Sequence, residues 1–312
     1  MDTPANAFSI ELSAVIVAVT GDAPRVLTVR DGEAVASGPF EPNHRTLELG
    51  VRAWVEARTH HALGYVEQLY TFADRDRITD DHRRTISLSY LALTREDEPA
   101  QEAGAVWRDW YDYFPWEDRR SGATTMIDAD IAPRLKTWAD LADDAGARRR
   151  RWQRAQLDFG LDDRPWNEEW ALQRYELLYE AGLVPEAARD RGAGRLEPLP
   201  RPGRAMVYDH RRILATGLSR LRAKIKYRPV VFELMPPTFT LLQLQRAVEA
   251  LAGERLHKQN FRRLVETQGL VEETGEMLTD TGGRPARLVR FRRDLLLQRA
   301  MAGTRLALSR SS

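Results

Sequence analysis

The amino-terminal part of the chain alternates between apolar and polar positions as β-strands do. Residues 8–20 form a long apolar run rich in β-branched side chains, a Gly-Asp-Ala-Pro turn follows, and residues 25–30 alternate again. Between residues 47 and 63 the apolar spacing becomes helical. Residues 66–72 and 85–94 predict two further strands. The pattern therefore indicates an α/β sandwich with one central helix over roughly the first 120 residues.

The pattern becomes irregular and mainly helical over residues 122–200. Four tryptophans stand there at roughly helical spacing and favour an extra helical layer packed by aromatic side chains: Trp138, Trp152, Trp166 and Trp170. The arginine run 148–151 indicates either a solvated helix face or a face for phosphate or DNA, and the solvated face is favoured. This stretch has three open roles, which are a dimer contact, a cover for a cleft and a second ligand site.

The carboxyl-terminal third has sharper signals. Residues 206–226 predict a basic amphipathic helix. Thr240 is a suitable N-cap for a helix that Gly253 ends, and a second helix over 258–268 is closed by Gly269. Two short apolar stretches around a glycine-containing tip then predict a β-hairpin. Helix, short turn, helix and hairpin is the order of a winged helix-turn-helix. We therefore expect a domain core over residues 1–121, a helical insertion and crossover over 122–204, and a linker helix with a winged-helix domain over 205–312.

Composition bounds the remaining function classes. The chain has 312 residues, of which 43% are hydrophobic, and this suffices for about two globular domains. No apolar run reaches 18 residues and the first residues lack a basic region, so we expect neither a membrane span nor a secretory signal. The absence of cysteine excludes disulfides and thiolate chemistry, and a reducing cytoplasm is the expected location.

The net charge of +1 conceals a strong asymmetry. Residues 201–312 carry 22 Lys and Arg against 10 Asp and Glu, whereas residues 1–200 carry 25 against 36. Such a division predicts a basic module for a polyanion joined to an acidic module with another task.

The second helix of the predicted winged helix carries the side chains that read DNA. Phe261, Leu264 and Val265 have helical spacing and are expected to face the core, so the basic and amide side chains face outward. Arg pairs with guanine, Asn and Gln pair with adenine, and Lys neutralises phosphate. The predicted DNA-binding residues are Thr240, Lys258, Gln259, Asn260, Arg262, Arg263, Arg284 and Arg287. The alternative to DNA binding is that this helix is a solvated basic face of a protein-interaction domain.

The sequence from FELMPPTFTLLQLQRAVEALAGERLHKQNFRRLVETQGLVEETGE to GRPARLVRF resembles the winged-helix domain of Nudix-related repressors of NAD metabolism. These are the NrtR-type and NadQ-type regulators. The Tyr-Asp-His triplet at residues 208–210 and the KIKYRPVVFELMPP approach fit the same family, and the length and insertion favour its NadQ-like branch. The resemblance implies an α+β fold with a Nudix-like α/β/α sandwich, a helical insertion and a winged helix-turn-helix domain.

When the sequence is aligned to the Nudix catalytic box, only some of the residues of the box are present. Gly38 and Arg52 fall in register, and His44 stands where the first glutamate belongs. Ala53 and Ala57 replace two of the three helix glutamates, and Glu56 alone remains. Mg²⁺ needs several hard oxygen ligands, so we predict no catalytic residues, no metal site and no hydrolase activity. An ion pair between Glu56 and Arg52 is an equally supported role for that glutamate.

The resemblance implies that the degenerate cleft senses a nucleotide, with ADP-ribose, NAD and ATP as candidates and no cofactor required. The predicted contacts are Arg30, Phe40, His44, Arg52 and Glu56. We expect a cytoplasmic homodimeric repressor that binds double-stranded operator DNA and does not bind membranes. The main alternative is an active hydrolase of ADP-ribose or another nucleoside diphosphate with an appended nucleic-acid domain. Whether the effector releases DNA is open, and the resemblance favours release.

Overall fold

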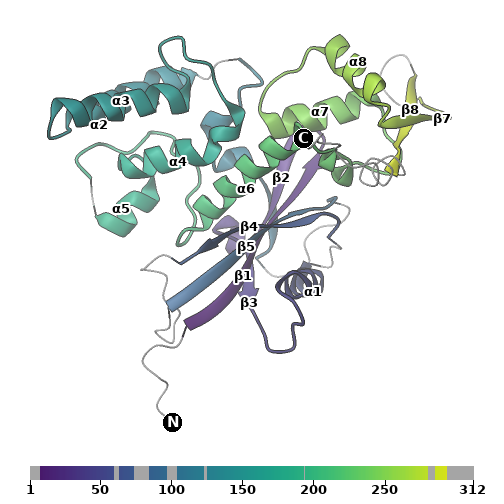
Figure 1. Cartoon of the computed structure of the whole chain (residues 1–312), viewed down its shortest axis with the longest axis horizontal. Coiled ribbons are helices and arrows are strands. Elements are labelled where there is room, and N and C mark those ends of the chain that lie inside the picture. Colours follow the sequence, from purple (N-terminus) through teal and green to yellow (C-terminus); the bar gives the residue numbers. More distant parts are fainter. Residues whose placement is uncertain are drawn as a thin grey trace, which may run out of the picture. The chain divides into compact units, whose positions relative to one another are not determined.

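The computed structural model describes residues 8–59, 63–73, 84–96, 104–122, 125–192, 194–279 and 285–293 (Figure 1). By compactness the chain divides into two units. Unit 1 comprises residues 1–234 and 247–255, and unit 2 comprises residues 235–246 and 256–312. None of the helices that the structure describes is both long and apolar enough to cross a bilayer.

The centre of unit 1 is a six-stranded mixed sheet in the order β4-β5-β1-β3-β2-β6. Its strands are β1 (Phe8–Thr20), β2 (Ala23–Val29), β3 (Ala34–Pro39), β4 (Val66–Phe72), β5 (Arg84–Leu93) and β6 (Val106–Asp109). β1 pairs in parallel with β5 and antiparallel with β2 and β3. The predicted strands are confirmed, whereas β3 and β6 are strands that the alternation did not predict.

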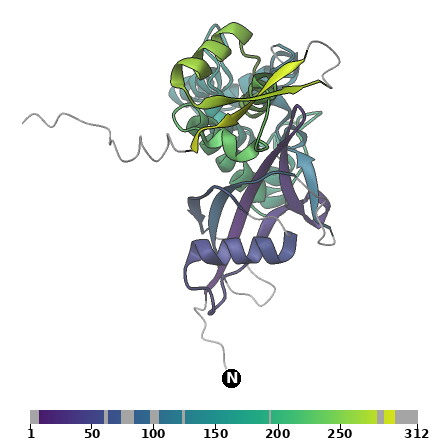
Figure 2. The same cartoon turned by 90° about the vertical axis from the view of Figure 1, so that its right-hand side faces the viewer.

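Two helices cover opposite faces of this sheet. Successive strand residues point to opposite faces, and Leu12, Ala14 and Ile16 of β1 join the core cluster that includes Val51 and Val55 of α1 (Leu47–Thr59). The intervening Val15 faces α6 (His210–Ile225) so closely that a Cβ added to Gly217 would lie 2.8 Å from its Cγ1. Figure 2 shows α1 lying across its own face of the strands.

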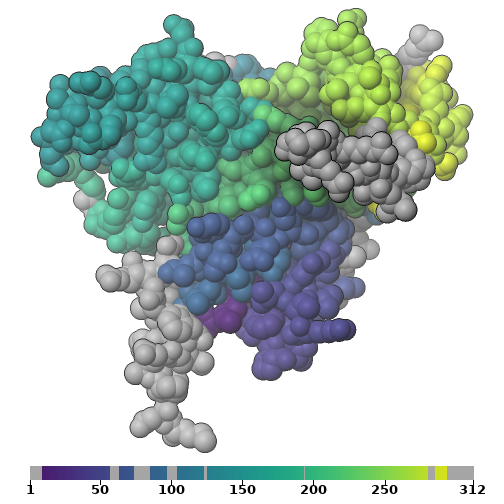
Figure 3. All heavy atoms as spheres, viewed as in Figure 1, coloured from purple at the N-terminus to yellow at the C-terminus, as the bar shows by residue number. Residues whose placement is uncertain are grey.

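The residues after the sheet form the predicted helical layer, which is coloured teal in Figure 3. It consists of α2 (Ala132–Asp140), α3 (Ala145–Phe159), α4 (Ala171–Glu180) and α5 (Pro185–Arg191). Of the four tryptophans in this layer, only Trp138 is buried, and the other three are partly exposed. Cations cover two of the others, because Lys136 lies over Trp152 and Arg174 lies over Trp166. The aromatic side chains therefore pack partly against arginine and lysine rather than against one another.

The basic helix over 206–226 differs from its prediction in two ways. It begins at His210, and it packs in unit 1 instead of joining the winged helix, because its apolar stripe covers the sheet. The division into segments 1–121, 122–204 and 205–312 remains a prediction.

Candidate nucleic-acid interface and effector site

Unit 2 contains the predicted order of elements. α7 (Leu241–Ala252) begins in this unit, and α8 (Lys258–Gln268), β7 (Val271–Leu278) and β8 (Ala286–Phe291) follow. A bridge between Phe239 and Val289 adds a third extended segment to the β7–β8 hairpin, with N–H to O distances of 2.9 and 2.8 Å. Helices and hairpin therefore form a winged helix-turn-helix.

Thr240 serves as the N-cap of α7. Its side-chain oxygen accepts from the backbone N–H of Gln243 at 3.2 Å, while the Gln243 side chain accepts from the Thr240 N–H at 2.7 Å. This reciprocal pair is a capping box that satisfies two helix-end donors. Thr240 is buried, and the cap explains its presence without any DNA contact, which stays a prediction.

The outer face of α8 carries the predicted polar side chains. Phe261 and Val265 are buried, but Leu264 is 54% exposed, so its predicted place in the core is wrong. The helical spacing holds for two apolar positions, and the third lies at the margin of the outer face. The five predicted DNA-reading side chains on this helix are all exposed: Lys258, Gln259, Asn260, Arg262 and Arg263.

The cations of this face form no ion pair among the described residues. Among the described residues, no carboxylate lies within ion-pair distance of Lys258, Arg262 or Arg263. The hairpin differs, because Arg287 pairs with Glu273 at 2.6 Å across two exposed side chains. Exposed pairs of this kind contribute about 0–1 kcal/mol, so Arg287 can exchange its partner at low cost. Arg284 lies outside the described residues.

The residues aligned with the predicted Nudix box, on β3 and α1, serve packing and ion pairing. A Cβ at Gly38 would lie 2.0 Å from Nε1 of Trp54, so close approach of this indole requires the glycine. Arg52 pairs with Glu48 at 3.0 Å and donates to the Leu63 carbonyl at 2.7 Å. The alternative pairing of Arg52 with Glu56 is therefore wrong, and Glu56 is exposed.

The two described carboxylates of α1, Glu48 and Glu56, stand eight residues apart, which is about 12 Å along a helix and too far to share one metal ion. No group of three or more His, Asp or Glu side chains within the described ranges is arranged to hold a metal ion.

The structure brings only some of the predicted effector contacts together. The rings of Phe40 and His44 lie 5.7 Å apart, and His44 packs beside Gly50 at the start of α1. Arg30 lies before β3 and Phe40 after it, so the six residues of this strand, about 17 Å, separate them. Phe40 and His44 therefore remain neighbouring candidate contacts near Ile10 of β1, to which the Phe40 N–H donates. Arg52 instead donates to the carbonyl of Gly64, whose N–H donates to Leu93 opposite Val17, so it lies towards the other end of β1.

A buried ionic network near the helical layer was not predicted. Glu117, in the short 3-10 helix Pro115–Glu117, accepts from Arg174 at 2.6 and 2.8 Å and also from Arg222. All three side chains are fully buried. Burial by itself raises the pKa of Glu117, but the two guanidinium groups outweigh it and hold the pKa below its usual value.

The same network holds the end of α7, whose last residues belong to unit 1. Arg222 donates to the Leu251 carbonyl at 2.9 Å, and the Tyr111 hydroxyl donates to the Ala250 carbonyl at 2.7 Å. Gly253 has φ +77°, and a Cβ there would lie 2.3 Å from the Glu117 carbonyl oxygen. These contacts satisfy helix-end carbonyls that otherwise need water.

Every arginine and lysine of the segment from Arg211 to Lys226 has a carboxylate partner from the first 200 residues. The pairs are Arg211–Glu186, Arg212–Glu176, Arg220–Glu67, Arg222–Glu117, Lys224–Glu67 and Lys226 with Glu168 and Glu169. The charge asymmetry along the chain is therefore partly internal, because the acidic part neutralises this helix.

The sequence comparison decides the identity of the carboxyl-terminal module. Residues 231–291 match the sequence model described as the NrtR DNA-binding winged helix domain. The winged helix of this chain is therefore similar to that domain over these residues. A curated relative, the ADPR responsive transcriptional repressor NtrR of Acinetobacter baylyi, is 41% identical over 86 residues, which are 28% of this chain. The chain spans about a third of that relative's length, since the match covers 34% of it.

Solved structures resemble the whole arrangement at low identity. Shewanella oneidensis NrtR complexed with a 27mer DNA matches 91% of this chain and 93% of its own, with TM-score 0.50 and 20% identity. A MutT/nudix family protein from Enterococcus faecalis matches 92% of this chain and 89% of its own, with TM-score 0.51 and 16% identity. The fold is therefore Nudix-like with a carboxyl-terminal winged helix domain, and the comparisons do not distinguish the NadQ branch.

Proposed function

We propose that this chain is a transcriptional repressor of genes of NAD metabolism. Its winged helix binds double-stranded operator DNA, and its Nudix-like domain binds a nucleotide effector. The observation that carries the proposal is the outer face of α8, where Lys258, Arg262 and Arg263 are exposed and form no ion pair among the described residues. Such a face has cations for phosphate and, through Gln259 and Asn260, amides for adenine.

DNA binding is tested with the full chain and duplexes selected by it from a random library. Phosphate contacts release counterions, so affinity falls steeply between 50 and 200 mM salt by roughly 10³-fold or more if about six phosphates are contacted. Lys258→Ala reduces the slope of log affinity against log salt by about one if it contacts one phosphate. An affinity that does not depend on salt favours the protein-interaction alternative and contradicts the proposal.

A homodimer presents two α8 helices to a pseudo-palindrome with half-sites about one helical turn apart. The effector must then bind free and DNA-bound protein with different affinities. The name of the Acinetobacter relative supports ADP-ribose, and the resemblance favours release of DNA. A thermal-shift panel of ADP-ribose, NAD, ATP and nicotinate identifies the effector, because a ligand of the native state raises the melting temperature. The selected ligand is then added to the DNA-binding assay.

We also propose that the Nudix-like domain has no hydrolase activity and that the chain acts in the cytoplasm. Support comes from α1, where Ala53 is exposed at the position of a catalytic glutamate and Glu48 is paired with Arg52. Incubation of the full chain with ADP-ribose and Mg²⁺, followed by chromatography, should give no AMP above background. Turnover above background restores the hydrolase alternative.

A further inference from the structure

The helical layer of unit 1 contains a cavity that the proposed repressor function does not use. Its volume is about 320 Å³, near the lower end of the range for ligand pockets. The ends of α2 and α4, the middle of α3, helix α5 and the residues after it form its wall. The cavity lies within residues 138–196 and therefore apart from α1 and its neighbouring effector candidates.

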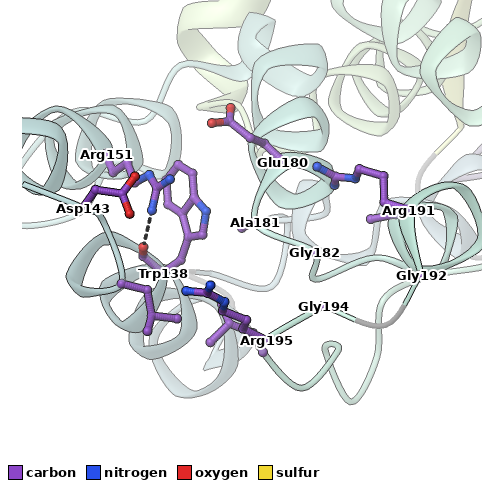
Figure 4. Close-up of a pocket in the computed structure, with 13 residues that line it drawn as sticks. Trp138, Asp143, Arg151, Glu180, Ala181, Gly182, Arg191, Gly192, Gly194 and Arg195 are labelled. Carbon is purple, nitrogen blue, oxygen red and sulfur yellow. Dashed lines mark hydrogen bonds between the residues drawn. The ribbon is translucent and has the colours of Figure 1, made fainter.

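Three guanidinium groups surround this opening. Figure 4 shows Arg151 and Arg195 on one side and Arg191 on the other. In the described part of the chain, none of the three lies within ion-pair distance of a carboxylate. Two acidic residues line the wall, but Arg154 already pairs with Glu180, which leaves Asp143 against three cations. The cavity is therefore electropositive, in contrast to the neutralised α6.

Two of these guanidinium groups are held in fixed planes. Arg151 lies 4.6 Å from the centre of the Trp138 ring and donates to the Trp138 carbonyl at 3.0 Å. Arg191 lies 4.5 Å from the Tyr179 ring and donates to the Tyr179 carbonyl. A guanidinium has five donors, so each retains N–H groups for a ligand, and its fixed position lowers the entropy lost on binding.

A second cavity of the same layer serves as an internal comparison. It has a similar volume, about 270 Å³, but Asp128 and Asp162 line it together with Arg119, whose guanidinium lies 4.4 Å from the Trp166 ring. The unpaired positive charge is therefore a property of the first cavity and not of the helical layer in general.

We propose that the cavity between Trp138 and Arg195 is a second ligand site for a small phosphorylated metabolite, up to the size of a nucleoside monophosphate. Arg151 and Arg191 present preorganised donors to the phosphate oxygens, and Arg195, which has no described partner, completes the charge. Paired N–H donors of this type match phosphate geometry. The site stands whether or not the chain binds DNA.

The test is calorimetric titration of the full chain with AMP, orthophosphate and adenosine, combined with hydrogen exchange. AMP should bind and protect backbone amides within residues 180–196, whereas adenosine should not. Equal binding of orthophosphate indicates recognition of phosphate alone, and stronger binding of AMP adds a role for the nucleoside; both support the site. Absence of AMP binding, or protection only around residues 40–52, overturns it.

The decisive variant is Arg195→Ala, because this exposed side chain makes no described contact that folding requires. Loss of one charged donor should weaken AMP binding about tenfold or more. Arg195→Lys should recover part of this loss, and Arg149→Ala, which removes an exposed arginine of α3 outside the cavity, should bind within twofold of the parent. Parent-like binding by Arg195→Ala overturns the proposal.

Discussion

Helices α6 and α8 are both basic and amphipathic in sequence, yet their cations have opposite surroundings. All six basic side chains from Arg211 to Lys226 meet carboxylates, and Arg211 and Arg222 are fully buried. On α8, by contrast, Lys258, Arg262 and Arg263 are exposed and form no ion pair within the described structure. Positive charge therefore indicates a polyanion partner only where the fold leaves it unpaired.

The largest effect on stability is expected from removing the anion of the buried network that includes Arg222 of α6. Glu117→Gln leaves the guanidinium groups of Arg174 and Arg222 buried without their anion, so the free energy of unfolding should fall by about 3–5 kcal/mol. Denaturant unfolding followed by circular dichroism measures the change. The matched control is Glu180→Gln, which removes an exposed pair with Arg154 and should cost about 0–1 kcal/mol. Equal losses in the two variants would contradict the assigned role of burial.

The next largest effect is expected on DNA affinity, after substitution of an exposed cation of α8. Arg262→Ala should weaken operator binding by roughly 1–3 kcal/mol if it contacts a base, without loss of stability. Arg220→Ala is the control from α6, since it removes one positive charge that already pairs with Glu67. Fluorescence anisotropy with a labelled duplex measures both variants. Unchanged affinity in Arg262→Ala would remove α8 from the interface.

A smaller effect depends on pH. The two arginines hold the pKa of Glu117 below its usual value of 4.5, so the unfolded chain binds this proton more readily than the folded chain. The stabilisation is complete above pH 4.5 and is lost as the pH falls towards the folded pKa, with a slope of at most about 1.4 kcal/mol per pH unit. The difference in unfolding free energy between the parent and Glu117→Gln should be constant between pH 6 and about pH 4.5, and it should shrink as the pH falls further. A constant difference from pH 6 down to pH 3 would contradict a lowered pKa of Glu117 in the folded chain.

The smallest effect separates the two faces of α8. Leu264 is mostly exposed, so Leu264→Ala should change the free energy of unfolding by no more than about 0.5 kcal/mol. Phe261→Ala on the buried face should cost about 3–5 kcal/mol. Thermal unfolding of the two variants tests this contrast. Similar losses would restore Leu264 to the core.

Local pattern predicted much of the fold. The limits of β1, β4 and α8 agree with the sequence, because long alternation and N-cap or glycine signals are local properties. Strand β3 was missed since its AVASGP sequence contains glycine, serine and proline, and four-residue β6 was hidden in an aromatic segment. Short strands of this kind depend on their neighbours in the sheet.

The candidate sites were less predictable because their determinants are distant in sequence. Arg222 meets Glu117 across 105 positions, and no local window distinguishes this buried arginine from an exposed one on α8. The lining of the cavity likewise joins α2, α3, α4, α5 and the residues after it. The outward face of α8 was predictable, since alternate sides of one helix follow from its own spacing.

The complete pairing of the α6 cations has a practical consequence for dissecting the protein. A fragment beginning near residue 205 would lose the acidic partners of this helix and uncover six positive charges beside an apolar stripe. It would adhere to any polyanion through a surface that the intact protein conceals. Nucleic-acid retention by such a fragment would therefore report on severed ion pairs, and only the uncut chain can reveal sequence preference.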